Sequence, residues 1–387
     1  MLSMNALHPS FAISIFLLAF LTAFILNKLF KHPINSKRFE SVDGLRGFLA
    51  IAVFMHHASI WYPYINTGVW ELPSSHLYTQ LGHTGVALFF MISCFLFVSK
   101  MLQVKDKGFN WNNFFISRFF RLSPLYFFSI AVLVLILLQT DHWAFNTPAP
   151  IFAKTLVEWF GFGIFGQNYI NNSMLTFVVN AGVVWSLPYE WLLYFSLPVL
   201  SILIPKARAS IFYILIGVTF VLIFNNIHGI FIEHIFSFLG GAIAPIIMRY
   251  NKVKFNINHL FFSLAVIICF GLILTFKSSS NPLCKLVITI AFTIIALGNN
   301  LFGLLKSSSL AFLGEISYST YLLHGMVLFI FFHYLIGMEK MASLSELKYC
   351  LVILGITPIV VIVSFLSYQL IELPFMKLSK KIQAKNL

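Results

Sequence analysis

Long apolar runs alternate with short polar loops along the whole chain. A helix needs about 20 apolar residues to cross the hydrocarbon core of a bilayer, and the runs have this length. They predict transmembrane helices at 11–29, 45–62, 81–100, 122–139, 183–204, 209–225, 230–248, 257–276, 284–304, 310–335 and 349–371. The sequence therefore predicts an all-α polytopic transmembrane helix bundle of about 11 spans, within a range of about 10–12.

One further apolar stretch, 151–166, is predicted not to cross. It carries Lys154 and Glu158, and charges within about 16 residues favour a re-entrant or interfacial segment. Crossing is the alternative, and it would reverse the predicted side of every later loop.

Composition excludes several classes of protein. Hydrophobic residues make up 59% of the chain and charged residues 10%, whereas soluble domains have about 25% charged residues. A porin-type barrel is excluded because its strands would alternate in segments of about ten residues. The net charge of +13 comes from basic residues in short loops, which is typical of topology signals and not of nucleic-acid binding. The cysteines show no CxxC or metal-ligand spacing, so no metal site is expected.

The basic residues divide unevenly between the two sides of the predicted spans. If the N-terminus is outside, all but five of the 25 Lys and Arg face the cytoplasm; the exceptions are Lys154, Lys277, Lys285, Lys340 and Lys348. Cytoplasmic loops are enriched in basic residues, so we expect the N-terminus outside and the C-terminus inside. The segment 1–30 is expected to be a retained anchor, because basic residues follow its apolar run instead of preceding it. We expect a basic cytoplasmic tail at 375–387.

The second predicted span carries Arg46 and His57, and ionisable residues in a bilayer are functional candidates because they are costly to insert. Their spacing places them about 20° apart on a helix, whereas His56 lies about 280° round from Arg46. His57 is roughly 16 Å along the helix from Arg46, which is near the middle of the bilayer. An imidazole there can act as a general base; a packing histidine is the alternative. Asp43 is close enough to pair with Arg46.

Arg118 and Arg121 lie three residues apart in ISRFFRLSPLY, at a predicted cytoplasmic helix start. Two guanidiniums on one face can hold phosphate oxygens bidentately. A positive-inside boundary pair is the alternative reading.

Trp185, Ser186 and Glu190 begin the span that the charge rule starts on the outer side. A carboxylate one turn inside that face could orient an imidazole or an acceptor hydroxyl. The alternative is an interfacial Trp belt with a hydrated carboxylate.

In the run 310–335, Ser317, Tyr321 and His324 follow one another at three- and four-residue steps and therefore share a stripe. Such residues can form a polar pocket, or they can serve only as contacts between helices.

Together these segments resemble the acyltransferase-3 family of membrane acyltransferases. The motifs occur in that family's order from about Glu40 to Pro374: VDGLRGFLAIAVFMHH, GHTGVALFFMISCFLF, the Arg118-x-x-Arg121 pair, WSLPYEWLLY, LGEISYSTYLLH and SYQLIELP, which contains Glu372. Two features depart from the family pattern, which are Cys94 at a position usually occupied by Gly and the additional first span.

The resemblance implies that the segment 40–374 is an acyltransferase domain. Such proteins move an acyl group, commonly acetyl from acetyl-coenzyme A, to a hydroxyl of a cell-surface glycan or other acceptor. The resemblance assigns catalysis to Arg46 and His57 and implies roles for Arg118 and Arg121, which we expect to bind the coenzyme. Direct transfer to the acceptor is the expectation, because we see no room for the appended esterase-like domain of some relatives.

The expected acceptor is a glycan or lipid-linked glycan, such as lipopolysaccharide O-antigen or exopolysaccharide, reached from the bacterial inner membrane. We expect Glu190 to assist catalysis and four residues to bind this substrate, namely Trp185, Ser186, Tyr321 and His324. His57 would deprotonate the acceptor hydroxyl or carry the acyl group itself. No permanently bound cofactor or nucleic-acid partner is expected.

Two other classes of function compete with this interpretation. An organic-anion transporter or channel would also contain buried Arg, His and Glu side chains. A structural membrane subunit would explain the spans but not the intramembrane Arg and His.

Overall fold

The computed structural model describes residues 5–30, 39–104, 108–250 and 257–385, and all regular structure in these ranges is helical. The basic residues Lys31, Lys37, Arg38, Lys105, Lys107, Lys252 and Lys254, which contribute to the predicted charge asymmetry, lie outside the described residues. The chain divides into two compact units: unit 1 comprises 1–95 and 236–365, and unit 2 comprises 96–235 and 366–387.

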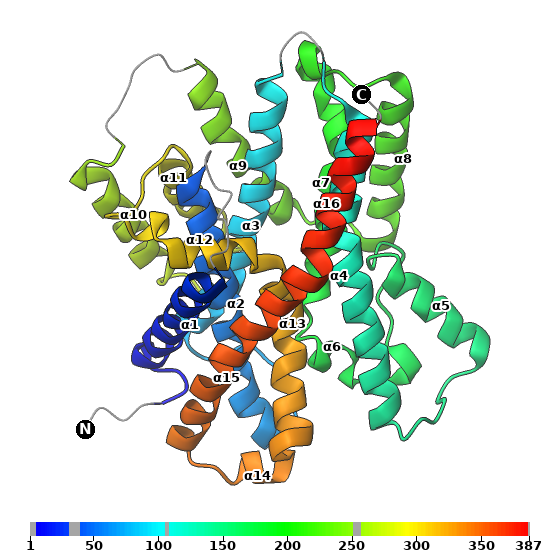
Figure 1. Cartoon of the computed structure of the whole chain (residues 1–387), viewed down its shortest axis with the longest axis vertical. Coiled ribbons are helices and arrows are strands. Elements are labelled where there is room, and N and C mark those ends of the chain that lie inside the picture. The colour runs from blue at the N-terminus through cyan, green and yellow to red at the C-terminus, as the bar shows by residue number, and fades with distance from the viewer. Residues whose placement is uncertain (1–4, 31–38, 105–107, 251–256, 386–387) are drawn as a thin grey trace. The chain divides into compact units, whose positions relative to one another are not determined.

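Unit 1 contains the helices of residues 1–95 and 236–365, and most of them are labelled in Figure 1. They are α1 (Pro9–Phe30), α2 (Glu40–Thr67), most of α3 (His76–Leu102), most of α9 (Ile232–Tyr250), α10 (Leu260–Ile273), α11 (Pro282–Ala296), η5 (Leu304–Lys306), α12 (Ser308–Glu315), α13 (Ser317–Ile330), η6 (Phe331–Ile336), α14 (Met338–Ala342) and most of α15 (Glu346–Ser367).

Unit 2 contains the middle of the chain and its last helix. Its elements are α4 (Trp111–Thr140), α5 (Ala149–Phe160), η1 (Ile170–Asn172), α6 (Leu175–Val179), η2 (Val183–Trp185), α7 (Ser186–Leu200), η3 (Ser201–Leu203), η4 (Pro205–Ala207), α8 (Ile211–His228), η7 (Tyr368–Glu372) and α16 (Leu373–Lys385). Within this unit α7 packs on α8, and α16 packs on α4.

The predicted polytopic helical bundle is confirmed. In the described part of the chain, nine helices are long and apolar enough to cross a membrane. The two remaining predicted spans coincide with the shorter apolar helices α10 and α11, so the total of about 11 stays a prediction. The stretch 151–166 forms only the 12-residue helix α5, which is too short to cross a bilayer that needs about 20 residues.

Two long predicted spans are not uniform α-helices. The run 310–335 breaks at Ile316 into α12 and α13 and then winds into the π-helical segment η6. The run 349–371 continues without interruption into α16, through a second π-helical segment, η7. Hydropathy alone misses these features, because a break or a π turn leaves the apolar character of the run unchanged.

A glycine contact sets the register between α2 and α12. A Cβ atom at Gly47 would lie 2.3 Å from the carbonyl oxygen of Leu310, and one at Gly314 would lie 2.1 Å from that of Asp43. Only glycine permits so close an approach of the two backbones. His57 and His324 each follow one of these glycines by ten residues, which is about 15 Å along a helix.

Because the glycines meet at one level and the two histidines at another, the path from Gly314 to His324 has the same direction as the path from Gly47 to His57, so α13 runs parallel to α2. The predicted topology requires this direction, since both segments are even-numbered spans. An extra crossing at 151–166 would have made them antiparallel.

Candidate active site

A pair of histidine side chains occupies the interface of α2 and α13 in unit 1. Nε2 of His324 lies 2.9 Å from Nδ1 of His57, and the ring centroids are 5.0 Å apart. His324 is fully buried and His57 is partly buried. We call this pair the histidine dyad. The sequence singled out both residues, but on separate grounds, and did not predict that they meet.

The hydrogen-bond partners determine which nitrogens of the neutral dyad carry protons. Nδ1 of His324 lies 2.9 Å from the carbonyl oxygen of Thr320, and a carbonyl can only accept, so this nitrogen donates. Nε2 of His324 is then a lone-pair acceptor. Nδ1 of His57 faces only acceptors, which are this nitrogen and the Val53 carbonyl oxygen at 3.1 Å. Nδ1 of His57 therefore carries the proton, and Nε2 of His57 keeps its lone pair.

His56 occupies a different environment from His57. Its Nδ1 donates to the carbonyl oxygen of Tyr78 at 2.8 Å, and its ring packs on α3 at Gly82, where a Cβ atom would lie 2.5 Å from the ring. This histidine has the contacts of a helix-packing residue. The two neighbouring histidines thus face different partners, as expected from their positions on the helix.

Three other candidate residues of unit 1 are Tyr321, Ser317 and Arg46, and none of them belongs to the dyad. The ring of Tyr321 is 6.5 Å from that of His324, while the Ser317 hydroxyl donates to the carbonyl of Gly314 at 2.8 Å. Arg46 lies 3.9 Å from Asp43, the ion pair that the sequence predicts. Because α2 is continuous, Arg46 remains roughly 16 Å along the helix from His57 and does not belong to the dyad.

In unit 2, Arg121 forms a buried ion pair. Its Nη1 lies 2.7 Å from a carboxylate oxygen of Glu372, whose side chain is fully buried, and 3.0 Å from the sulfur of Met376. The pair joins α4 to η7, and these two helices pack against each other. The prediction that Arg121 binds a coenzyme phosphate stays a prediction, and the structure adds that this guanidinium already has a carboxylate partner.

Arg118 belongs to a second polar group of unit 2, which links α4 to α7. Its guanidinium lies 5.2 Å from the ring centroid of Phe97, donates to Ser117 at 3.0 Å and interacts with the Tyr194 hydroxyl. That hydroxyl donates to Glu190, one turn earlier on α7. We call Arg118, Tyr194 and Glu190 the arginine–tyrosine–glutamate chain.

This chain corrects one expectation about depth. From the loop charges we expected Arg118 at the cytoplasmic surface and Glu190 close to the outer surface. Both side chains instead interact with the single hydroxyl of Tyr194. The physical reason is that Tyr194, one helical turn after Glu190, brings the two charged groups together through its phenol oxygen, whereas loop charges report only on helix ends.

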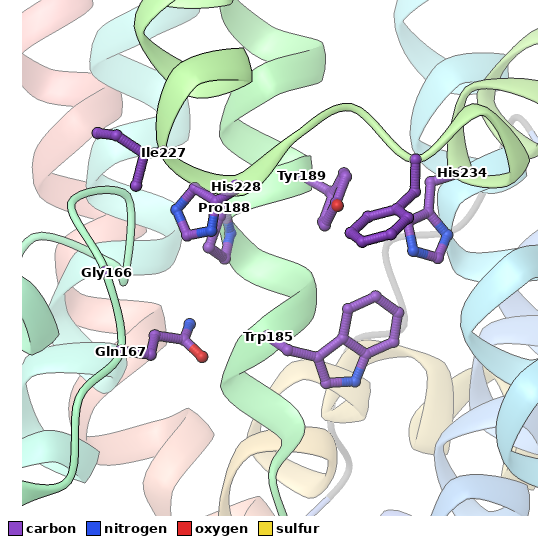
Figure 2. Close-up of a pocket in the computed structure, with 9 residues that line it drawn as sticks. Gly166, Gln167, Trp185, Pro188, Tyr189, Ile227, His228 and His234 are labelled. Atoms are coloured by element: carbon purple, nitrogen blue, oxygen red, sulfur yellow. The ribbon is translucent and has the colours of Figure 1, made fainter.

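A cavity of about 360 Å³ opens beside the start of α7 in unit 2 (Figure 2). Trp185 lines it and is 40% exposed. Ser186 is buried, and its hydroxyl donates to the carbonyl of Val183 at 3.2 Å. Of these two predicted substrate-binding residues, the structure places only Trp185 among the residues that line the cavity.

Sequence reasoning missed several residues of these clusters. Glu372 was noted only as part of a motif, and its pairing with Arg121 joins positions far apart in the chain. His228 and Gln167 line the cavity. The only sequence signal for His228 was that it lies next to a glycine, at the junction of two apolar runs. Among the described residues, no three His, Cys, Asp or Glu side chains gather as metal ligands do.

Comparison with known families covers most of the chain. A family model described as an acyltransferase domain, that of acyltransferase 3, matches residues 39–369. No curated protein and no solved structure matches the chain.

Proposed function

Because the chain belongs to the acyltransferase-3 family, we propose that it transfers an acyl group from cytoplasmic acyl-coenzyme A to a hydroxyl of a cell-surface glycan. Family membership places it among membrane acyltransferases. The proposal names acetyl-coenzyme A as the donor and lipopolysaccharide O-antigen or exopolysaccharide as the acceptor class. The bacterial inner membrane is the proposed location.

The observation that supports this reaction is the histidine dyad. Thioester alcoholysis needs a group that takes the proton of the attacking hydroxyl, and Nε2 of His57 has the required lone pair. As the acceptor oxygen bonds to the thioester carbonyl carbon, its proton passes to Nε2. The carbon–sulfur bond then breaks, and the coenzyme leaves with that proton as a free thiol. His324 holds the ring of His57 in one tautomer while this happens.

The same lone pair could instead attack the thioester carbonyl and carry the acyl group as an acyl-imidazole. The two routes differ in a measurable way, because only the second gives thiol release without an acceptor. A rapid-quench experiment with acetyl-coenzyme A alone should show a burst of one thiol per enzyme for the carrier route and no burst for the general-base route.

The proposed donor is a polyanion, and Arg118 is the guanidinium proposed to bind its phosphates. A change at Arg118 on donor binding would then be transmitted to Glu190, because the Tyr194 hydroxyl donates to Glu190 and also interacts with Arg118. Tyr321, beside His324, is proposed to contact the acceptor.

The proposed function is tested with the full chain in lipid nanodiscs. Acetyl-coenzyme A and a cell-envelope glycan extract should together yield free thiol and a glycan that is heavier by one acetyl group per site. The added mass identifies the acyl group, and the glycan fraction that carries it identifies the acceptor class. Folded protein that releases no thiol and changes no glycan mass with any acyl-coenzyme A would contradict the proposal.

The proposed orientation has its own test, in which an impermeant thiol reagent is applied to intact cells. In a cysteine-free background, Ser3→Cys should be labelled from outside, and Lys380→Cys, an exposed position on α16, only after permeabilisation. Labelling of both from one side would contradict an odd number of crossings and the cytoplasmic donor.

A further inference from the structure

The cavity of unit 2 has an aromatic wall and a wall formed by a loop. No residue of either wall takes part in the proposed proton transfer. Its volume of about 360 Å³ lies at the lower end of the roughly 300–1,000 Å³ typical of small-molecule pockets. In Figure 2, Gln167 and His228 lie toward the left of the space, and Trp185, Tyr189 and His234 lie toward the right.

The first wall is aromatic. Trp185 and Tyr189 lie one turn apart at the start of α7, and the imidazole of His234 packs on both, with centroid distances of 5.2 Å and 4.6 Å. Phe231 lies 6.1 Å from the same imidazole. The mutual contacts fix these rings, so that the exposed indole presents a rigid flat surface.

The second wall is a loop that several hydrogen bonds hold in place. Asn168 donates its side-chain amide to Glu158 at 2.8 Å, and its carbonyl accepts from the Trp159 indole at 2.8 Å. Nε2 of His228, at the end of α8, donates to the carbonyl of Ile164 at 2.9 Å. Gln167 is therefore presented by an ordered loop, and a preorganised site loses less entropy when a ligand binds.

This wall offers two hydrogen-bond acceptors to a ligand. Because Nε2 of His228 donates to a carbonyl, Nδ1 of the neutral ring keeps the lone pair. The Gln167 amide nitrogen donates to the carbonyl of Val184 at 3.4 Å, so the amide oxygen remains the acceptor of that side chain. A ligand with hydroxyl donors matches these two atoms.

We propose that this cavity binds one neutral sugar ring of the acceptor glycan, an inference that rests on the proposed function. The apolar C–H face of the ring stacks on the Trp185 indole, and ring hydroxyls donate to Gln167 and His228. The described residues that line the cavity include no lysine, arginine or carboxylate, so it does not suit the phosphates of the coenzyme. A lipid tail would leave the amide and imidazole acceptors without donors.

The position of the cavity agrees with an acceptor site. It lies where α7 begins, α8 ends and α9 begins, and the predicted topology puts all three of these helix ends on the outer side. Glu190 directly follows Tyr189 on α7. A sugar on the indole would therefore lie next to the arginine–tyrosine–glutamate chain.

Binding without turnover tests the proposal. Saturation-transfer NMR is recorded on the full chain in nanodiscs with a panel of methyl glycosides of neutral hexoses and 6-deoxyhexoses, and with no acyl donor. At least one glycoside should bind to the wild-type protein. Trp185→Ala should weaken its binding by about tenfold or more, because stacking on a fixed aromatic surface is lost, and His228→Ala should weaken it by a smaller factor.

Trp143→Ala is the matched control, since this indole is 60% exposed in the same unit and does not line the cavity. It should bind the glycoside as the wild type does. Equal binding by the wild type and Trp185→Ala, or no binding of any glycoside to folded wild-type protein, would overturn the sugar site. Size-exclusion elution and thermal unfolding confirm that each variant is folded.

The assay also separates this inference from the proposed function. Acyl transfer to a glycan with an unchanged acceptor KM in Trp185→Ala would overturn the site and leave the function standing. Trp185-dependent sugar binding without any acyl transfer would support the site and refute the function.

Discussion

The histidine dyad of unit 1 and the Arg121–Glu372 pair of unit 2 are both largely buried polar pairs that join two helices. They differ in whether a lone pair remains for a reaction. In the ion pair, the positive and negative charges neutralise each other at 2.7 Å. In the dyad, Nδ1 of His324 donates to the carbonyl of Thr320, and Nδ1 of His57 donates to Nε2 of His324. Nε2 of His57 therefore keeps a lone pair. We therefore propose that the Arg121–Glu372 pair stabilises the fold and that the histidine dyad supplies a base.

The largest effect is expected at His57. His57→Ala should lower the rate of acyl transfer by about 10²–10⁴-fold, the usual contribution of a general base, and should leave the folded protein intact. Turnover is measured by thiol release at saturating donor.

His56→Asn is the matched control, because the amide nitrogen can still donate to the carbonyl of Tyr78 where the imidazole does. It should retain most of the activity. Equal loss in both variants would refute the assignment of chemistry to the dyad face of α2.

A large effect on stability, with no direct effect on chemistry, is expected at Glu372. Glu372→Gln leaves the Arg121 guanidinium without its buried counter-charge, and breaking such a pair costs about 3–5 kcal/mol. Thermal unfolding of the purified protein measures the loss. The double variant Arg121→Met with Glu372→Leu should recover much of the stability, since it removes both charges.

The same variants test whether the Arg121–Glu372 pair also takes part in donor binding. If the double variant is stable but its donor KM is strongly raised, the pair belongs to the donor site as the sequence predicted for Arg121. An unchanged donor KM would leave the pair with its structural role.

An intermediate effect is expected at His324, which acts through His57. His324→Ala should lower turnover by about 10–100-fold, as is common when the partner that orients a reactive imidazole is removed. His324→Gln places an amide oxygen near the position of Nε2 and should restore part of the activity. Loss of the same size in both variants, with an unchanged pH profile, would indicate a packing role only.

The smallest effect is expected at Arg118. Arg118→Ala should raise the KM for acetyl-coenzyme A by about tenfold, the loss of roughly one charge-assisted interaction with a phosphate. Arg118→Lys should rescue poorly, because an ammonium does not reproduce the planar fork. Tyr194→Phe removes the shared hydroxyl but keeps the ring, and an equal rise in KM there would show that Arg118 acts through the arginine–tyrosine–glutamate chain.

The helices were predictable because each apolar run has to cover the thickness of a bilayer, and the motif glycines were visible in the sequence as Gly47 and Gly314. Their role in setting the register of α2 against α12 was not visible, because a close approach is a property of two backbones. For the same reason the sequence identified His57 and His324 individually but not as a dyad.

The polar chain of unit 2 shows a second limit. Loop charges place the ends of helices relative to the membrane, but they do not report how far a side chain reaches. Tyr194 ends the WSLPYEWLLY motif but was not singled out as a candidate, although its hydroxyl donates to Glu190 and interacts with Arg118. In a span that is otherwise apolar, hydropathy does not distinguish a tyrosine that makes polar interactions from one that only packs.

We propose that Nε2 of His57 is the unprotonated, reactive nitrogen of a neutral dyad, and ¹⁵N NMR of histidine-labelled protein at neutral pH tests this assignment. The resonances of His57 are identified by their loss in His57→Asn. The expected spectrum shows a protonated Nδ1, hydrogen-bonded to His324, and an Nε2 with the chemical shift of a lone-pair nitrogen. A proton on Nε2 of His57, with Nδ1 bare, would contradict it.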